Sequence, residues 1–275
     1  MNYKNIGKGI NLIAKLSPSL AQKISFKLFT SPRPRKPKAE EIDFLKTASR
    51  QAITHNNLKI QAYIWGKSDK KVLFSHGWES NAGRWRSFIP GLVEAGYQVI
   101  AFDAPGHGAS EGKQLHLVIF MDAIQAMFKE FGSFEALVGH SMGAGASVMS
   151  LATQQLPHPK KMVVLGSFAE VREVYNNYAT MLGLTPKLET EFNKTIKRLS
   201  GYDVPYFSVA QKAGQLHDNT LGLIIHDKQD KTIAIQEARN IAQGWPSAKY
   251  IETDGAGHSL QNDMIFTEVV SFITT

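Results

Sequence analysis

Residues 136–153 constrain the fold of this chain most strongly. Ala136 to Val138 is typical of a buried strand, and Ala144 to Thr153 is a run of small, helix-compatible residues. The turn between them, Gly139-His140-Ser141-Met142-Gly143, matches the pattern G-x-S-x-G. In a strand–turn–helix context we expect a strained Ser141 whose hydroxyl projects above a sheet, close to the unpaired N–H groups of a helix N-terminus.

The two glycines of this motif have a steric explanation. Side chains at Gly139 and Gly143 would collide with the neighbouring strand and helix. The motif alone leaves an alternative open, because a chain with 22 glycines can contain such a turn merely to let a helix pack closely on a sheet.

Strands and helices alternate along most of the chain. Helices of about a dozen residues between short apolar strands predict βαβ units and a parallel sheet. An antiparallel hairpin over 48–54 and 58–65 would lie at one edge. We expect an earlier helix over 40–50, further strands over 71–75, 97–102, 162–165, 221–225 and 249–252, and further helices over 84–95, 118–131, 233–243 and 263–272.

A helical segment, residues 168–219, interrupts this alternation. An insertion between two strands would lie over the carboxyl ends of the strands, so we expect a lid. The alternative is a surface excursion with its own small core.

Composition excludes several classes of function. The chain has no cysteine, which excludes disulfides, thiolate metal sites and a cysteine nucleophile. The longest uncharged stretch, 136–159, is broken by polar residues and is not a membrane span. Lys15 interrupts the first apolar segment, so we expect no secretory signal and a cytoplasmic protein.

The net charge of +7 is concentrated in an N-terminal arm, residues 1–45. Residues 1–38 contain nine Lys or Arg and no Asp or Glu, so the rest of the chain has a net charge of −2. Apolar residues at helical spacing (Ile6, Ile10, Ile13, Leu16, then Leu20, Ile24, Leu28) predict two helices, the second capped by Ser17-Pro18. A basic, proline-rich linker follows over 31–38.

Two interpretations of this arm remain open. Its helices could pack on the domain with solvated lysines outside, or residues 1–38 could lie on an anionic membrane surface. No nucleic-acid partner is expected, since no recognised module accompanies the basic residues.

An activated serine needs a base and an orienting acid. His258 follows the last strand in a Gly-rich turn and is the expected base. Asp230 and Asp227 both follow the preceding strand and qualify as the acid, although aspartates also favour plain turns.

The same chemistry needs donors for an oxyanion. The backbone N–H groups of Trp78 and Met142 are the candidates, because Gly77 allows close backbone approach after the early strand. His76 is expected to be supporting rather than catalytic.

Taken together, these motifs resemble those of α/β-hydrolases. The resemblance is carried by His76-Gly77, the turn Asp103–Ser110, Gly139–Gly143, His226–Asp230 and Gly255–His258, in this order over residues 58–275. It implies an eight-stranded, mostly parallel sheet flanked by helices, a helical lid inserted after the sixth strand, and a Ser141–Asp230–His258 triad. One position departs from the family pattern, where glycine often stands in place of Asp227; the resemblance still assigns the acid to Asp230.

We therefore expect three parts: the arm (1–45), an α/β-hydrolase core (46–167 and 220–275) and the lid (168–219). The resemblance implies a serine hydrolase that cleaves a carboxylic ester or a related acyl bond of a small molecule without metal or cofactor. A thioesterase, an acyltransferase, a C–C bond hydrolase or a non-catalytic hydrolase-like binding protein remain alternatives. The apolar insertion and basic arm favour lipid-like substrates and a position at the inner membrane surface.

Overall fold

The computed structural model describes residues 3–216 and 220–275 and consists of two compact units. The sheet unit comprises Pro32–Ala169 and Val209–Thr275, and the helical unit comprises Met1–Ser31 and Glu170–Ser208. Residues 1–2 of the expected arm and 217–219 of the expected insertion lie outside the described residues.

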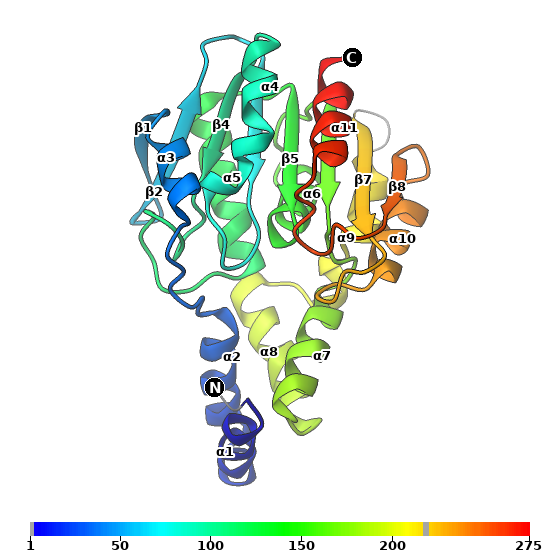
Figure 1. Cartoon of the computed structure of the whole chain (residues 1–275). Helices are drawn as coiled ribbons and strands as arrows, with labels where there is room; N and C mark the ends of the chain where they lie inside the picture. The colour runs from blue at the N-terminus through cyan, green and yellow to red at the C-terminus, as the bar shows by residue number, and fades with distance from the viewer. Residues whose placement is uncertain (1–2, 217–219) are drawn as a thin grey trace. The chain divides into compact units, whose positions relative to one another are not determined.

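The sheet unit is built on eight strands in the order β1-β2-β4-β3-β5-β6-β7-β8 (Figure 1). Only β2 runs antiparallel to its neighbours β1 and β4, while all other pairs are parallel. The strands are Ser49–His55, Leu58–Trp65, Lys71–Ser75, Gln98–Phe102, Ala136–His140, Lys161–Leu165, Leu221–Asp227 and Lys249–Thr253. The expected mostly parallel sheet with a hairpin at its edge is confirmed.

Helices cover both faces of this sheet. One group comprises α3 (Ala39–Leu45), the 3₁₀ helix η1 (Ala82–Ser87), α4 (Ile89–Glu94) and α11 (Asp263–Thr274). The other comprises α5 (Leu117–Phe131), α6 (Met142–Thr153), α9 (Val209–Ala213) and α10 (Ile235–Gly244), with the short η3 (Gly214–Leu216). Since side chains alternate along a strand, Phe74 and Val138 join the core with Trp85 and Val269 of the first group.

Two expected helices are shorter than the sequence pattern suggests. The helix expected over 40–50 ends at Leu45, because Ser49 already pairs with Ile64 in the β1–β2 ladder. The helix expected over 84–95 is divided into η1 and α4 near Pro90, which has no N–H to donate and whose ring excludes a preceding helical turn.

The helical unit joins the N-terminal arm to the inserted segment. It contains α1 (Tyr3–Leu16), α2 (Pro18–Thr30), α7 (Val171–Leu182), α8 (Lys187–Ser200) and η2 (Val204–Phe207). Helix α1 packs on α2 and α7, and α2 packs on α8. Ser17 caps α2 through its hydroxyl, which accepts a hydrogen bond from the Leu20 N–H at 3.3 Å, as predicted from Ser17-Pro18.

The apolar stripe expected on α1 is split. Ile6, Ile10 and Ile13 pack in a cluster with Leu182 of α7, whereas Leu16 is 91% exposed. Periodicity identified the helix correctly, but a neighbour far along the chain decides which of its apolar side chains are buried. All the described helices are too short or too polar to span a bilayer.

Candidate active site

Ser141 lies in a strained turn between β5 and α6. Its φ of 52° and ψ of −121° are rare for a residue with a side chain. A Cβ on Gly139 would lie 2.4 Å from the Cα of Ala144, and one on Gly143 would lie 2.3 Å from the carbonyl oxygen of His76. The expected steric need for both glycines is confirmed, and it explains how the chain turns sharply enough to present the serine.

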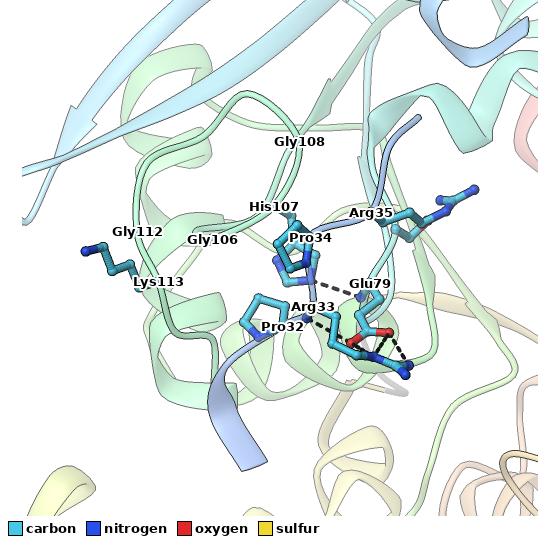
Figure 2. Close-up of a pocket in the computed structure, with 11 residues that line it drawn as sticks. Pro32, Arg33, Pro34, Arg35, Glu79, Gly106, His107, Gly108, Gly112 and Lys113 are labelled. Carbon is cyan, nitrogen blue, oxygen red and sulfur yellow. Dashed lines mark hydrogen bonds and ion pairs between the residues drawn. The ribbon is translucent and has the colours of Figure 1, made fainter. Parts of the chain in front are cut away.

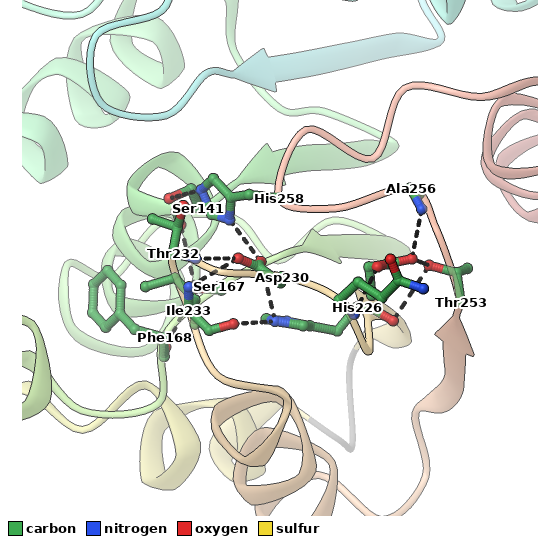
Figure 3. Close-up of polar contacts among 12 residues, drawn as sticks. Ser141, Ser167, Phe168, His226, Asp230, Thr232, Ile233, Thr253, Ala256 and His258 are labelled. Carbon is green, nitrogen blue, oxygen red and sulfur yellow. Dashed lines mark hydrogen bonds and ion pairs between the residues drawn. The ribbon is translucent and has the colours of Figure 1, made fainter.

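The structure brings Ser141, His258 and Asp230 together from three loops at one end of the sheet (Figure 3). Nε2 of His258 lies 3.2 Å from Oγ of Ser141, and Nδ1 of His258 lies 2.7 Å from Oδ2 of Asp230. With Nδ1–H donating to the carboxylate, Nε2 is left as an acceptor facing the serine hydroxyl.

The carboxylate of Asp230 is fully buried and has four hydrogen-bond donors around it. Oδ1 accepts from the backbone N–H groups of Thr232 (2.7 Å) and Ile233 (2.9 Å), while Oδ2 faces His258 and, at 3.3 Å, Nε2 of His226. Burial alone would raise the pKa of Asp230, but the hydrogen bonds from His226 and His258 outweigh it and hold the pKa below its usual range. The group therefore stays ionised at neutral pH.

Asp227 has other partners. Its Oδ2 accepts from the Thr253 hydroxyl and the Ala256 N–H, both at 2.8 Å, and its Oδ1 accepts from the Gln229 N–H at 2.9 Å. The alternative acid therefore ties the loop that carries His258 to β7 and β8, and the imidazole itself is bonded to Asp230.

Two residues that the sequence did not single out hold the backbone around His258. Nε2–H of His140 donates to the carbonyl oxygen of His258 at 2.7 Å, and Nη2 of Arg84 donates to the carbonyl oxygen of Ser259 at 2.8 Å. Burial, followed by the charge of Arg84, holds the pKa of His140 well below its usual range, so His140 is neutral. His140 stands inside the G-x-S-x-G motif, whereas no local pattern marks Arg84.

The proposed oxyanion donors lie on either side of the serine. A Cβ on Gly77 would come within 3.0 Å of the Ser141 Cβ, so the loop after β3 passes directly against the nucleophile. Within residues 3–216 and 220–275, the N–H groups of Trp78 and Met142 donate no hydrogen bond. Neither N–H group is therefore engaged by an acceptor in the described part of the chain.

His76 supports this loop. Its Nδ1–H donates to the Gly77 carbonyl oxygen at 2.7 Å, and its Nε2 accepts from the Ala104 N–H at 2.9 Å. Burial lowers its pKa well below the usual range, so it stays neutral. The next loop is tied in by Asp103, which accepts from the N–H groups of Ala82 (2.8 Å) and Ala109 (2.9 Å).

The linker after α2 reaches the residue that follows Trp78. The guanidinium and backbone N–H of Arg33 both donate to the Glu79 carboxylate, with a shortest distance of 2.7 Å (Figure 2). Here the chain encloses a hollow of about 320 Å³ between the linker and the turn at Gly106–Gly108. The eleven lining residues do not include the Ser141–His258–Asp230 group, so this hollow is separate from it.

Metal-ligating side chains are not clustered in the described part of the chain. Among the residues that the structure describes, no group of three or more His, Asp or Glu side chains is arranged to hold a metal ion.

Comparison with known proteins identifies the family to which the chain belongs. The family model for serine aminopeptidase S33 matches residues 66–203, half of the chain. A serine hydrolase-like protein of Dictyostelium discoideum is 32% identical over 122 residues, covering 40% of this chain and 32% of that protein. A non-heme haloperoxidase of Rhodococcus erythropolis is 32% identical over 106 residues, covering 38% of each. These matches span about a third of the relatives' own length.

Solved structures share the fold. A bromoperoxidase from Bacillus anthracis superposes with a TM-score of 0.61 at 21% identity, covering 82% of this chain and 99% of that one. The esterase Pf2001 of Pyrococcus furiosus superposes with a TM-score of 0.62 at 20% identity, covering 88% and 94%.

Proposed function

Because the chain belongs to the serine aminopeptidase S33 family of α/β-hydrolases, we propose that it is a serine hydrolase that cleaves a carboxylic ester or a related acyl bond. The observation that carries the proposal is the pair of contacts made by His258, 3.2 Å to the Ser141 hydroxyl and 2.7 Å to the Asp230 carboxylate. A nucleophile, a base and an orienting acid in this order are the parts of an acyl-transfer site.

In the first half-reaction His258 acts as the general base. Its Nε2 removes the Ser141 proton while Oγ attacks the substrate carbonyl carbon, and the ionised Asp230 stabilises the imidazolium that forms. The imidazolium then gives this proton to the departing alcohol, which leaves the acyl group on Ser141.

In the second half-reaction water attacks the acyl-enzyme with His258 again as base. The negative charge on the carbonyl oxygen develops twice, and the N–H groups of Trp78 and Met142 are the proposed donors to it. Each such donor typically contributes ~2.7–4 kcal/mol of transition-state stabilisation. The unpaired state of both N–H groups supports this assignment.

Fluorophosphonate labelling, located by peptide mapping, tests the activated serine. We expect one adduct, on Ser141, which is absent in Ser141→Ala and strongly slowed in His258→Ala. Ser133→Ala is a matched control, because Ser133 is an exposed serine outside the Ser141–His258–Asp230 group, and labelling of this variant should equal that of the wild type.

A second probe separates poor access from an unactivated serine. If the folded wild type reacts with neither a bulky fluorophosphonate nor phenylmethylsulfonyl fluoride, the non-catalytic binding protein becomes the better reading. Reaction with the small probe only would support the lid expected from residues 168–219, which stays a prediction.

A comparison of matched substrates would then identify which type of acyl bond the protein cleaves. A thioesterase, an acyltransferase and a C–C bond hydrolase could use the same residues with a different leaving group or acceptor. Esters of increasing chain length, the corresponding thioesters and aminoacyl anilides should be compared by kcat/KM. We expect esters of medium or long acyl chains to be preferred.

A further inference from the structure

Helix α2 buries its small and polar side chains and exposes its large aliphatic ones. Its buried residues are Ala21, Gln22, Ser25 and Thr30. Its exposed aliphatic residues are Leu20, Ile24 and Leu28, at 50%, 40% and 37% exposure. Phe26 and Phe29 of α2 pack against the cluster of Tyr175 and Phe192, so the three aliphatic residues form a second apolar face of the helix, and this face stays exposed.

Helix α1 adds two exposed leucines to this unit. Leu12 and Leu16 are 64% and 91% exposed, and α1 packs on α2. Side chains four residues apart in one helix are neighbours on its surface, which joins Leu12 to Leu16 on α1 and Leu20, Ile24 and Leu28 to one another on α2. We call Leu12, Leu16, Leu20, Ile24 and Leu28 the aliphatic row. Five exposed aliphatic side chains on two packed helices exceed the single scattered apolar residues that a protein surface normally carries.

Lysines flank the aliphatic row, and no acidic residue lies among them. The exposed lysines of α1 and α2 are Lys4, Lys8, Lys15, Lys23 and Lys27, and residues 1–38 contain no Asp or Glu. None of these five lysines forms an ion pair within the described part of the chain. The inserted segment, residues 170–208, has five basic and five acidic residues, so the positive charge of the helical unit comes from α1 and α2.

A basic hollow adjoins this surface where α2 meets α8. Its volume is about 230 Å³, and its charged lining is Lys23, Glu191, Lys194 and Arg198. Glu191 is paired with Lys194 at 2.7 Å, so Lys23 and Arg198 remain available to an anionic group.

We propose that the helical unit docks on the surface of an anionic phospholipid bilayer through the aliphatic row. The leucines would enter the boundary between headgroups and acyl chains, and the lysines would contact lipid phosphates and carboxylates. This surface differs from the one that periodicity suggests, because the isoleucines of α1 pack in the cluster with Leu182 of α7 and do not belong to the aliphatic row.

Charge and apolar surface together favour an anionic bilayer over two other partners, a second copy of the chain and nucleic acid. A second copy of the chain would bring two lysine-rich surfaces together without a compensating acid. Nucleic acid would satisfy the lysines but would leave the leucines in water. An anionic bilayer offers both negative charge and an apolar layer at the depth that side chains reach.

A site-specific probe tests the docking in the full-length protein. Because the chain has no cysteine, Leu16→Cys introduces a single thiol for the polarity-sensitive fluorophore NBD. We expect brightening and a blue shift on vesicles with a quarter phosphatidylserine, and little change on pure phosphatidylcholine. The same label at Leu221→Cys, which is 61% exposed on the sheet unit, should not respond.

Charge reversal supplies a second test, read by vesicle co-sedimentation. Each lysine near an anionic surface contributes on the order of fivefold in affinity, so the combination of Lys15→Glu, Lys23→Glu and Lys27→Glu should weaken binding at least about 100-fold. The matched control reverses Lys67, Lys70 and Lys129, which are also exposed, and should weaken binding less than about fivefold. Equal losses in both combinations would refute a specific docking surface.

Removal of the aliphatic row supplies a third test. Combining Leu12→Ser, Leu16→Ser and Leu20→Ser should weaken vesicle binding at least about tenfold while leaving its salt dependence unchanged. Unchanged binding would mean that only polyanion attraction operates, which contradicts the proposal. The proposal would also be contradicted if the NBD label at position 16 brightened without vesicles and light scattering gave a doubled mass. The partner of this surface would then be a second copy of the chain. Ser141→Ala should bind as the wild type does, which separates docking from the proposed chemistry.

Discussion

Asp230→Asn is the substitution that most directly tests the proposed acid. Oδ1 of Asp230 accepts two backbone N–H groups, so an asparagine would keep its carbonyl oxygen there. Its NH₂ group would then occupy the Oδ2 position, where it faces Nδ1 of His258 and Nε2 of His226. Nε2 of His226 already donates to the Ile233 carbonyl oxygen at 2.9 Å, so two donors would oppose each other.

The other way to accommodate the asparagine is a change of tautomer at His258, and this change removes the general base. His258 would have to accept from the amide at Nδ1 and carry its proton on Nε2, where it faces Ser141. An imidazole in that tautomer cannot take the serine proton. The equivalent change in serine proteases lowers kcat by about 10⁴, which corresponds to about 5.4 kcal/mol in activation free energy. We expect a loss of this size in ester turnover and in the rate of fluorophosphonate labelling.

Asp227→Asn is the matched control. This carboxylate has three donors but does not contact the imidazole, so the loss of one hydrogen bond should slow turnover by no more than about tenfold. If Asp227→Asn abolished turnover while Asp230→Asn retained more than about a tenth of it, with both variants folded, our assignment of the acid would be wrong.

Asp230→Asn should also change how the free energy of unfolding depends on pH. Because the pKa of Asp230 is lowered in the folded protein, its ionised form stabilises the fold above the unfolded pKa of 3.8, and this contribution is lost as pH falls through the folded pKa. The difference in unfolding free energy between wild type and Asp230→Asn should therefore be largest near neutral pH and shrink below about pH 4. Urea unfolding at several pH values measures it, and a difference that grew on acidification would contradict the reasoning.

Three further predictions concern other parts of the chain. Gly143→Ala places a Cβ 2.3 Å from a backbone oxygen and should destabilise the fold by about 3 kcal/mol, whereas Gly9→Ala, with nothing within 4 Å, should be neutral or stabilising by about 0.5–1 kcal/mol in thermal unfolding. Arg84→Met removes the donor to the carbonyl after the imidazole and should slow serine labelling about tenfold with Tm nearly unchanged; an unchanged rate would exclude a positioning role. Arg33→Ala should raise the pKa of Glu79, because the hydrogen bond from Arg33 is the largest cause of its lowering, and should cost less than about 1 kcal/mol at pH 7 since Arg33 is 71% exposed; a larger cost in urea unfolding would contradict this.

Local chemistry explains the features that the sequence predicted well. The strand–turn–helix around Ser141, the β1–β2 hairpin and the Ser17 cap each depend on residues within one or two turns of chain. Such local features can be recognised in the sequence itself. They include glycines at positions that tolerate no Cβ, and apolar residues that recur with a period of 2 in strands or 3.6 in helices. The order of the motifs along the chain then reduced the number of possible folds and identified Ser141, Asp230 and His258 as candidate site residues.

Contacts between distant residues decided the rest. Asp227 and Asp230 are three residues apart in one turn and chemically identical, so only the path of the chain from β7 to the loop of His258 selects which carboxylate meets the imidazole. Arg84 and His140 support that loop from 175 and 118 residues away, distances at which a sequence pattern carries no signal.

The helical unit separates the two kinds of information most clearly. The sequence by itself determined that the N-terminal arm is helical, apolar at regular spacing and strongly basic, because propensity, capping and charge are local properties. Only the tertiary structure decided that the isoleucines of α1 pack against α7, where Ile10 is buried, while the aliphatic row stays exposed. The physical reason is that a helix has two or more faces able to bury apolar surface, and the free energy of burial is realised only on the face where a partner packs.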